Sequence, residues 1–142
     1  MCDISLKKIE HYLYQYNLLD YEIALLEEKI TDCNYKQTYN IWIKKQNNSL
    51  ENEAIRNINI EQKIYTIKKW KTLITKILEK FKFEDNKMYK FICYKYFKKL
   101  NYYQIFARMN LNKKEQEELK TEILNYILVV AIKKNMLKEV QV

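Results

Sequence analysis

The chain of 142 residues contains neither glycine nor proline. An average protein of this length would carry roughly ten glycines and seven prolines. Glycine is the usual residue where the backbone needs a positive φ, and proline is the usual residue that ends a helix. Without them, the sequence predicts an all-α fold of helices joined by short polar turns. It also excludes functions that need glycine-rich loops, such as the P-loop, the dinucleotide-binding loop and the nucleophile elbow.

Charge is distributed unevenly along the chain. Residues 1–34 hold three lysines and seven acidic residues, whereas residues 35–142 hold 23 basic and 11 acidic residues. The stretch 35–99 alone carries 16 basic and six acidic residues. This asymmetry is typical of a polyanion-binding protein with a separate interaction arm, which favours nucleic acid as the partner. The alternative explanation for the excess of lysine is an AT-rich genome, in which lysine is the most common surface residue whatever the protein binds.

Several classes of site are excluded by the residues that are present. The longest apolar run, residues 127–132, is too short to cross a bilayer, and the N-terminus has no signal-peptide pattern, so we expect a cytoplasmic protein without a membrane partner. Cys2, Cys33 and Cys93 indicate free thiols in a reducing compartment, with a tertiary pairing of two of them as the alternative. His11 is the single histidine, so we expect no metal and no cofactor. Scattered carboxylates without a paired nucleophile and base predict that the protein is not an enzyme.

An apolar heptad pattern marks the first helix. Its seam, at alternating steps of three and four, consists of Ile9, Tyr12, Tyr16, Leu19, Ile23, Leu26 and Ile30. The pattern predicts a coiled-coil-like helix that either pairs with a second copy through residues 9–30 or packs on a helix of its own chain. We expect residues 1–34 to form an acidic arm, and residues 35–48 to connect it to a helical domain over residues 49–142.

Capping signals predict the helices of the C-terminal domain. The expected helices are a long central one over residues 49–83 and three shorter ones over residues 87–99, 102–109 and 113–135. Asn101 is the expected cap of the short third helix, and Asn112 with Glu115 forms a capping box for the last. Before this domain, the apolar cluster at residues 39–43 fits a helical turn and a short extended piece equally.

The last three helices have the layout of a helix-turn-helix unit over about residues 100–130. The apolar contacts expected between its helices come from Ile105, Met109, Leu111, Leu119 and Ile123. In such a unit the second helix projects its N-terminal half into the major groove of DNA. The sequence therefore predicts a DNA-binding module, with a plain three-helix packing unit as the alternative.

Most of the chain resembles the phage-encoded transcriptional regulators of the RinA and ArpU type, which end in a helix-turn-helix similar to region 4 of bacterial sigma factors. The similar segments are residues 49–54 (SLENEA), 70–78 (WKTLITKIL), 87–97 (KMYKFICYKYF) and 100–105 (LNYYQI). The resemblance implies an activator of phage late genes, acting in the cytoplasm of a bacterial host cell on double-stranded DNA. The alternative is a non-enzymatic helical interaction module, whose acidic arm contacts RNA polymerase or its sigma factor.

Candidate DNA contacts lie on the last two helices and just before them. They are Lys98, Lys99, Tyr102, Tyr103, Gln104, Lys113, Lys114, Gln116, Glu117 and Lys120. We expect the helix that starts at about Lys113 to enter the groove, the short helix to touch the DNA backbone, and the first two lysines to reach phosphates.

Three positions depart from the usual motif. Phe106 and Gln116 stand where a small residue and a buried β-branched residue are usual, and Asn110 stands where the turn usually has glycine. Asn tolerates positive φ better than most residues, so the motif requires a left-handed conformation at Asn110.

Overall fold

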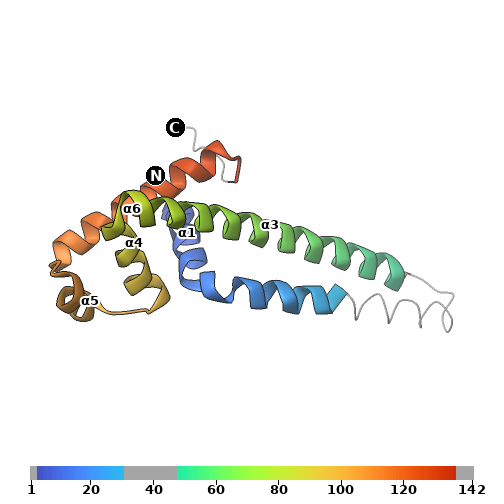
Figure 1. The fold of residues 1–142 in the computed structure, drawn as a ribbon. Coiled ribbons are helices and arrows are strands. Elements are labelled where there is room, and N and C mark those ends of the chain that lie inside the picture. Colours follow the sequence, from blue (N-terminus) through green and yellow to red (C-terminus); the bar gives the residue numbers. More distant parts are fainter. Residues whose placement is uncertain (1–2, 31–47, 137–142) are drawn as a thin grey trace. The chain divides into compact units, whose positions relative to one another are not determined.

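The computed structural model describes residues 3–30 and 48–136, and within these ranges it contains helices and turns but no strand, so the predicted all-α fold is confirmed. The elements are α1 (Asp3–Gln15), η1 (Tyr16–Leu18), a helix over residues 19–30, α3 (Asn48–Glu84), α4 (Asn86–Ile92), η2 (Cys93–Phe97), α5 (Tyr102–Met109) and α6 (Lys113–Lys133) (Figure 1). Cys2, Cys33 and the predicted cluster at residues 39–43 lie outside the described residues.

The chain divides into two compact units, and both include part of α3. Unit 1 comprises Met1–Asn17 and Lys71–Val142, and unit 2 comprises Leu18–Trp70. This division differs from the expected separation of an arm over residues 1–34 from a domain over residues 49–142. The helix that was expected to be continuous over three heptads is interrupted by η1, a single 3₁₀ turn, and the boundary between the units falls there.

Unit 2 is a pair of helices that lie side by side, the helix over residues 19–30 and the first part of α3 (Figure 1). Its buried side chains are Leu19, Ile23, Leu26, Ile64, Ile67 and Trp70. An exposed ion pair joins the two helices, with Lys68 Nζ 3.6 Å from Glu27 Oε1. Three of the seam residues, Leu19, Ile23 and Leu26, are therefore covered within one chain, which supports the expected packing on a helix of its own chain.

Unit 1 places α1 in the core beside η2 and α6. Ile9 and Leu13 are fully buried, whereas the predicted seam residue Tyr12 is only half-buried. The hydroxyl of the fully buried Tyr96 donates to Glu10 Oε2 at 2.9 Å. The Tyr14 ring packs edge-on against the ring of Tyr96, with 4.7 Å between centroids. The first half of the expected arm is thus a structural part of the C-terminal unit.

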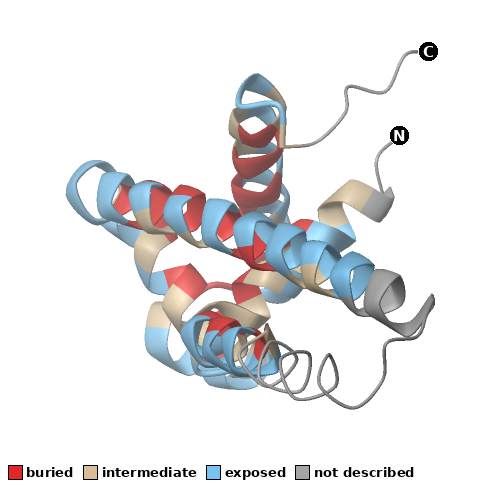
Figure 2. Cartoon of the chain, turned by 90° about the vertical axis from the view of Figure 1, so that its right-hand side faces the viewer, coloured by how far each residue is buried: buried red, intermediate tan, exposed pale blue. Residues whose placement is uncertain are grey.

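The predicted helix over residues 87–99 is only partly α-helical. After α4 the chain forms the π-helix η2, in which Lys98 N donates to Cys93 O at 2.9 Å. Lys99 then adopts a left-handed conformation with φ 55°, and Leu100 N donates to Tyr94 O at 3.0 Å, which ends the helix as glycine usually does. Where these helices carry buried residues, those residues occupy one side and exposed residues the other (Figure 2).

Candidate nucleic-acid interface

Two capping boxes fix the helices of the candidate interface. At the start of α5, Gln104 N donates to Asn101 Oδ1 at 2.9 Å, and Asn101 N donates to Gln104 Oε1 at 2.9 Å. At the start of α6, Glu115 N donates to Asn112 Oδ1 at 2.8 Å, and Asn112 N donates to Glu115 Oε1 at 3.2 Å. Each box satisfies backbone donors that a helix N-terminus leaves unpaired. The predicted caps and the predicted bounds of α5 are therefore confirmed.

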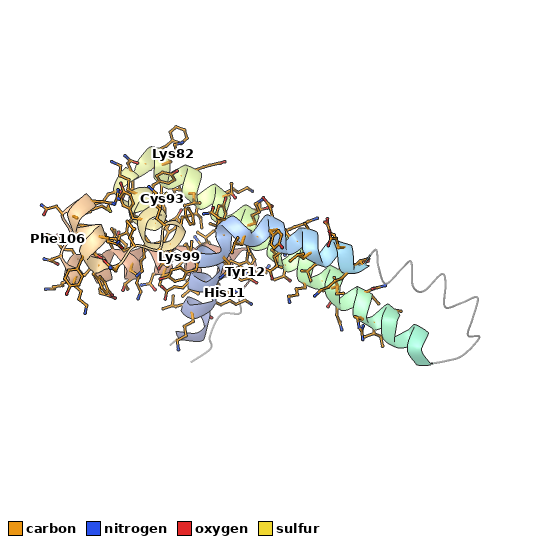
Figure 3. All side chains as sticks on the ribbon, turned by 90° about the horizontal axis from the view of Figure 1, so that it is seen from below. His11, Tyr12, Lys82, Cys93, Lys99 and Phe106 are labelled. Carbon is orange, nitrogen blue, oxygen red and sulfur yellow. The ribbon has the colours of Figure 1, made fainter. Side chains whose placement is uncertain are left out.

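The turn between α5 and α6 has the geometry that the motif requires. Asn110 adopts φ 57° and ψ 37°, which is the left-handed region, and its N–H donates to Phe106 O at 2.8 Å. Leu111 is buried and Asn112 is already the cap of the next helix. Asparagine thus replaces the glycine of the usual turn, and Phe106 causes no crowding because its side chain is 51% exposed (Figure 3).

Gln116 links α6 to α5 and to the turn between them from inside unit 1. It is only 2% exposed, and its Nε2 donates to Leu111 O at 2.8 Å and to Tyr102 O at 3.1 Å. One side chain of α6 therefore bonds both the turn and the first residue of α5. The prediction that Gln116 contacts DNA is not supported by this position, because the amide is enclosed between the helices. Its Oε1 has no hydrogen-bond partner among the described residues.

A polar cluster joins the two helices beside this amide. The hydroxyl of Tyr102 donates to Glu117 Oε1, and Lys120 Nζ lies 3.6 Å from Glu117 Oε2. The hydrogen bond lowers the pKa of Glu117 and raises the pKa of Tyr102. Lys113 Nζ lies 5.1 Å from the centre of the Tyr102 ring. Tyr102, Glu117 and Lys120 were predicted as DNA contacts, but the structure brings them together as half-buried partners of one another.

The remaining predicted contacts are exposed. They are Lys98, Lys99, Tyr103, Gln104, Lys113 and Lys114, and Lys99 is visible at the end of η2 in Figure 3. The exposed charged residues of α6 balance one another, since Glu115, Glu118 and Glu122 are matched by Lys113, Lys114 and Lys133. Positive charge at the interface therefore comes from the residues before α6 more than from α6 itself.

Sequence reasoning missed two basic residues near the predicted contacts, Arg108 and Lys95. The segment 86–114 carries eight basic residues and no acidic residue. Within it, Lys98 Nζ and Arg108 Cζ lie 5.3 and 5.6 Å from the centre of the same ring, that of Tyr94. Lys95, also missed, is half-buried, and burial lowers its pKa. The acid-free stretch was visible in the sequence and could have indicated Arg108; the shared ring could not be foreseen.

The described residues contain no group of three or more His, Cys, Asp or Glu side chains that could hold a metal ion. No helix in that part of the chain combines the length and the apolar character needed to span a bilayer. Comparison of the chain with protein-family models, with curated proteins and with solved structures found no match.

Proposed function

We propose that unit 1 is the DNA-binding module of a transcriptional regulator. The observation that carries the proposal is the arrangement of α5, the turn and α6. Asn110 supplies the left-handed turn, and Gln116 of α6 donates hydrogen bonds to the turn and to the first residue of α5. This arrangement is the one by which a second helix enters the major groove while the first crosses the DNA backbone. The resemblance to RinA and ArpU regulators adds the more specific proposal of a phage late-gene activator.

In this proposal, exposed lysines supply affinity and α6 supplies sequence preference. Lys98 and Lys99 before α5, and Lys113 and Lys114 at the start of α6, are placed to contact phosphates. Base contacts would come from exposed positions in the first turns of α6, of which Glu118 is the clearest, since a carboxylate can accept from cytosine N4. We therefore expect binding that depends strongly on salt and discriminates only modestly between sequences.

Fluorescence anisotropy with a late-gene promoter duplex over a salt series tests the proposal. Four phosphate contacts predict a slope of log K against log salt of about −3 to −4. The double variant Lys113→Ala with Lys114→Ala should lower the magnitude of that slope by about two. A control that removes two exposed lysines elsewhere, Lys63→Ala with Lys133→Ala, should leave it close to wild type. Absence of duplex binding at low salt would rule the proposal out.

An interaction module is the second candidate, and exposed aromatic side chains on α5 favour it. Tyr103 is 86% exposed and Phe106 is 51% exposed, one turn apart on the same helix. Exposed aromatic residues are enriched where proteins bind proteins. Biolayer interferometry with purified bacterial RNA polymerase holoenzyme tests this candidate. Tyr103→Ser with Phe106→Ser should abolish binding, whereas Val129→Ser, a half-exposed apolar residue on α6, should not.

A further inference from the structure

We infer that Lys98 and Arg108, held on the ring of Tyr94, form a phosphate-binding pair, and that the phosphate it takes belongs to a nucleic-acid backbone. We refer to these two residues as the cation pair. The inference rests on the proposed function and extends it, because it assigns a contact with the nucleic-acid backbone to residues at the end of η2 and at the end of α5. Neither Arg108 nor Tyr94 belongs to the helix expected to enter the groove.

The geometry brings together two cations from different elements. Lys98 follows η2 directly, and Arg108 lies in the last turn of α5, yet both charged groups lie within 6 Å of the centre of the Tyr94 ring. An aromatic ring attracts a cation through its quadrupole and so restricts where the charge lies. Both cations are exposed and Tyr94 is half-buried, so the ring positions the pair at the surface.

The backbone beneath the cation pair is also fixed. Lys98 N donates to Cys93 O at 2.9 Å, which closes the π-helical turn, and the left-handed Lys99 ends it. On the other side, Arg108 lies two residues before Asn110, whose N–H is bonded to Phe106 O. The two side chains therefore extend from anchored backbone, which lowers the entropy lost when they bind a ligand.

No carboxylate among the described residues neutralises the charge of the cation pair. Across residues 3–30 and 48–136, neither Lys98 nor Arg108 has a carboxylate within ion-pair distance. No acidic residue occurs anywhere in the segment 86–114. An anion that binds both groups neutralises positive charge that no carboxylate of the described residues compensates. Arginine binds phosphate through two parallel N–H bonds and lysine adds a point charge, which matches a phosphodiester group.

Salt-dependent anisotropy with duplex DNA gives the first arm of the test. The full chain is compared with Lys98→Gln combined with Arg108→Gln, and with the control Lys82→Gln combined with Lys133→Gln, which removes the same charge from exposed positions of unit 1. The cation-pair variant should lower the magnitude of the salt slope by about two, and the control should lower it by less than one. Far-UV circular dichroism confirms that each variant is folded.

Nuclear magnetic resonance with inorganic pyrophosphate gives the second arm. Pyrophosphate should shift the Arg108 side-chain signal and the Lys98 amide signal of the wild-type chain, and these shifts should be lost in the cation-pair variant. Duplex binding with an unchanged salt slope in that variant overturns the inference while the proposed function stands. If the wild type binds no duplex but shows these shifts, the proposed function fails and the assignment of the phosphate to a nucleic-acid backbone is overturned with it, although the two residues still bind phosphate. Absence of the pyrophosphate shifts overturns the inference.

Discussion

The substitution Gln116→Glu tests whether the buried amide holds α5, α6 and the turn between them together. It keeps the shape of the side chain but replaces the donor that bonds Leu111 O and Tyr102 O with an acceptor. Two lost hydrogen bonds cost about 1–3 kcal/mol. Keeping the introduced carboxyl protonated at pH 7, against an ordinary pKa near 4.3, costs about 3.7 kcal/mol. Since a protonated carboxyl restores one bond, we expect a total loss of about 4–5 kcal/mol.

This loss should depend on pH with a defined sign. Burial beside two carbonyl oxygens raises the pKa of the introduced carboxyl in the folded state above its unfolded value. The penalty is therefore complete above the folded pKa and disappears as the pH falls to about 4.3. Urea denaturation followed by circular dichroism should show a large difference from wild type at pH 7 that shrinks to about 1 kcal/mol near pH 4.5. Equal free energies of unfolding for the wild type and the Gln116→Glu variant at pH 7, or a difference that is the same at both pH values, would refute the reasoning.

Gln116→Met is the matched control for this experiment. It removes both hydrogen bonds but introduces no ionisable group, so its loss should be about 1–3 kcal/mol at either pH. A loss of 4–5 kcal/mol approaches the whole stability of a small domain, so the glutamate variant can be largely unfolded at pH 7. In that case the stability of the methionine variant still measures the two hydrogen bonds. The stability of the glutamate variant near pH 4.5 still measures the effect of the protonated carboxyl.

Substitutions at three further positions follow from the same unit, and those at Asn112 and Asn110 are measured by urea denaturation. Asn112→Ala should cost about 1 kcal/mol through loss of the cap of α6, and an unchanged midpoint would contradict the capping box. Asn110→Val should cost about 1–2 kcal/mol because of its left-handed φ, whereas Asn110→Gly should stay within about 1 kcal/mol of wild type. Tyr102→Phe should return the lowered pKa of Glu117 toward its ordinary value, as an NMR titration would show. The stability that Glu117 contributes exists above its unfolded pKa and is lost as the pH falls through its folded pKa. The stability of the Tyr102→Phe variant should therefore fall less than that of the wild type as the pH is lowered. The same dependence of stability on pH in both chains would exclude the hydrogen bond.

The parts of the fold that follow from local signals could be predicted from the sequence. Both capping boxes involve residues three apart, and each lies beside the helix that it starts. Such contacts depend on nearby residues alone, so the sequence indicates them without knowledge of the fold. The left-handed turn at Asn110 belongs to the same class, since the residue itself tolerates that conformation.

Long-range contacts explain what could not be predicted. The Tyr16 hydroxyl shares a 2.6 Å hydrogen bond with the Thr75 hydroxyl, 59 residues away in sequence, at the point where the first helix is interrupted. Tyr96 and Glu10 are 86 residues apart. A heptad pattern records which residues are apolar but not which partner covers them, so it could not assign residues 1–17 to the C-terminal unit. The buried position of Gln116 was hidden similarly, because a polar side chain inside a motif is recognised only by its partners.

The insertion of unit 2 between the two halves of unit 1 has a consequence for synthesis on the ribosome. Unit 2 is contiguous, so its two helices can associate once the chain has emerged to about Trp70. The α1 helix needs η2 and α6, which are made some 80 to 120 residues later, a delay of roughly 5–25 s at 5–20 residues per second. During that interval the apolar face of α1, with Ile9 and Leu13, lacks the two elements that contact it most, η2 and α6. The nascent chain thus exposes an amphipathic helix that chaperones can bind until the last helix is complete.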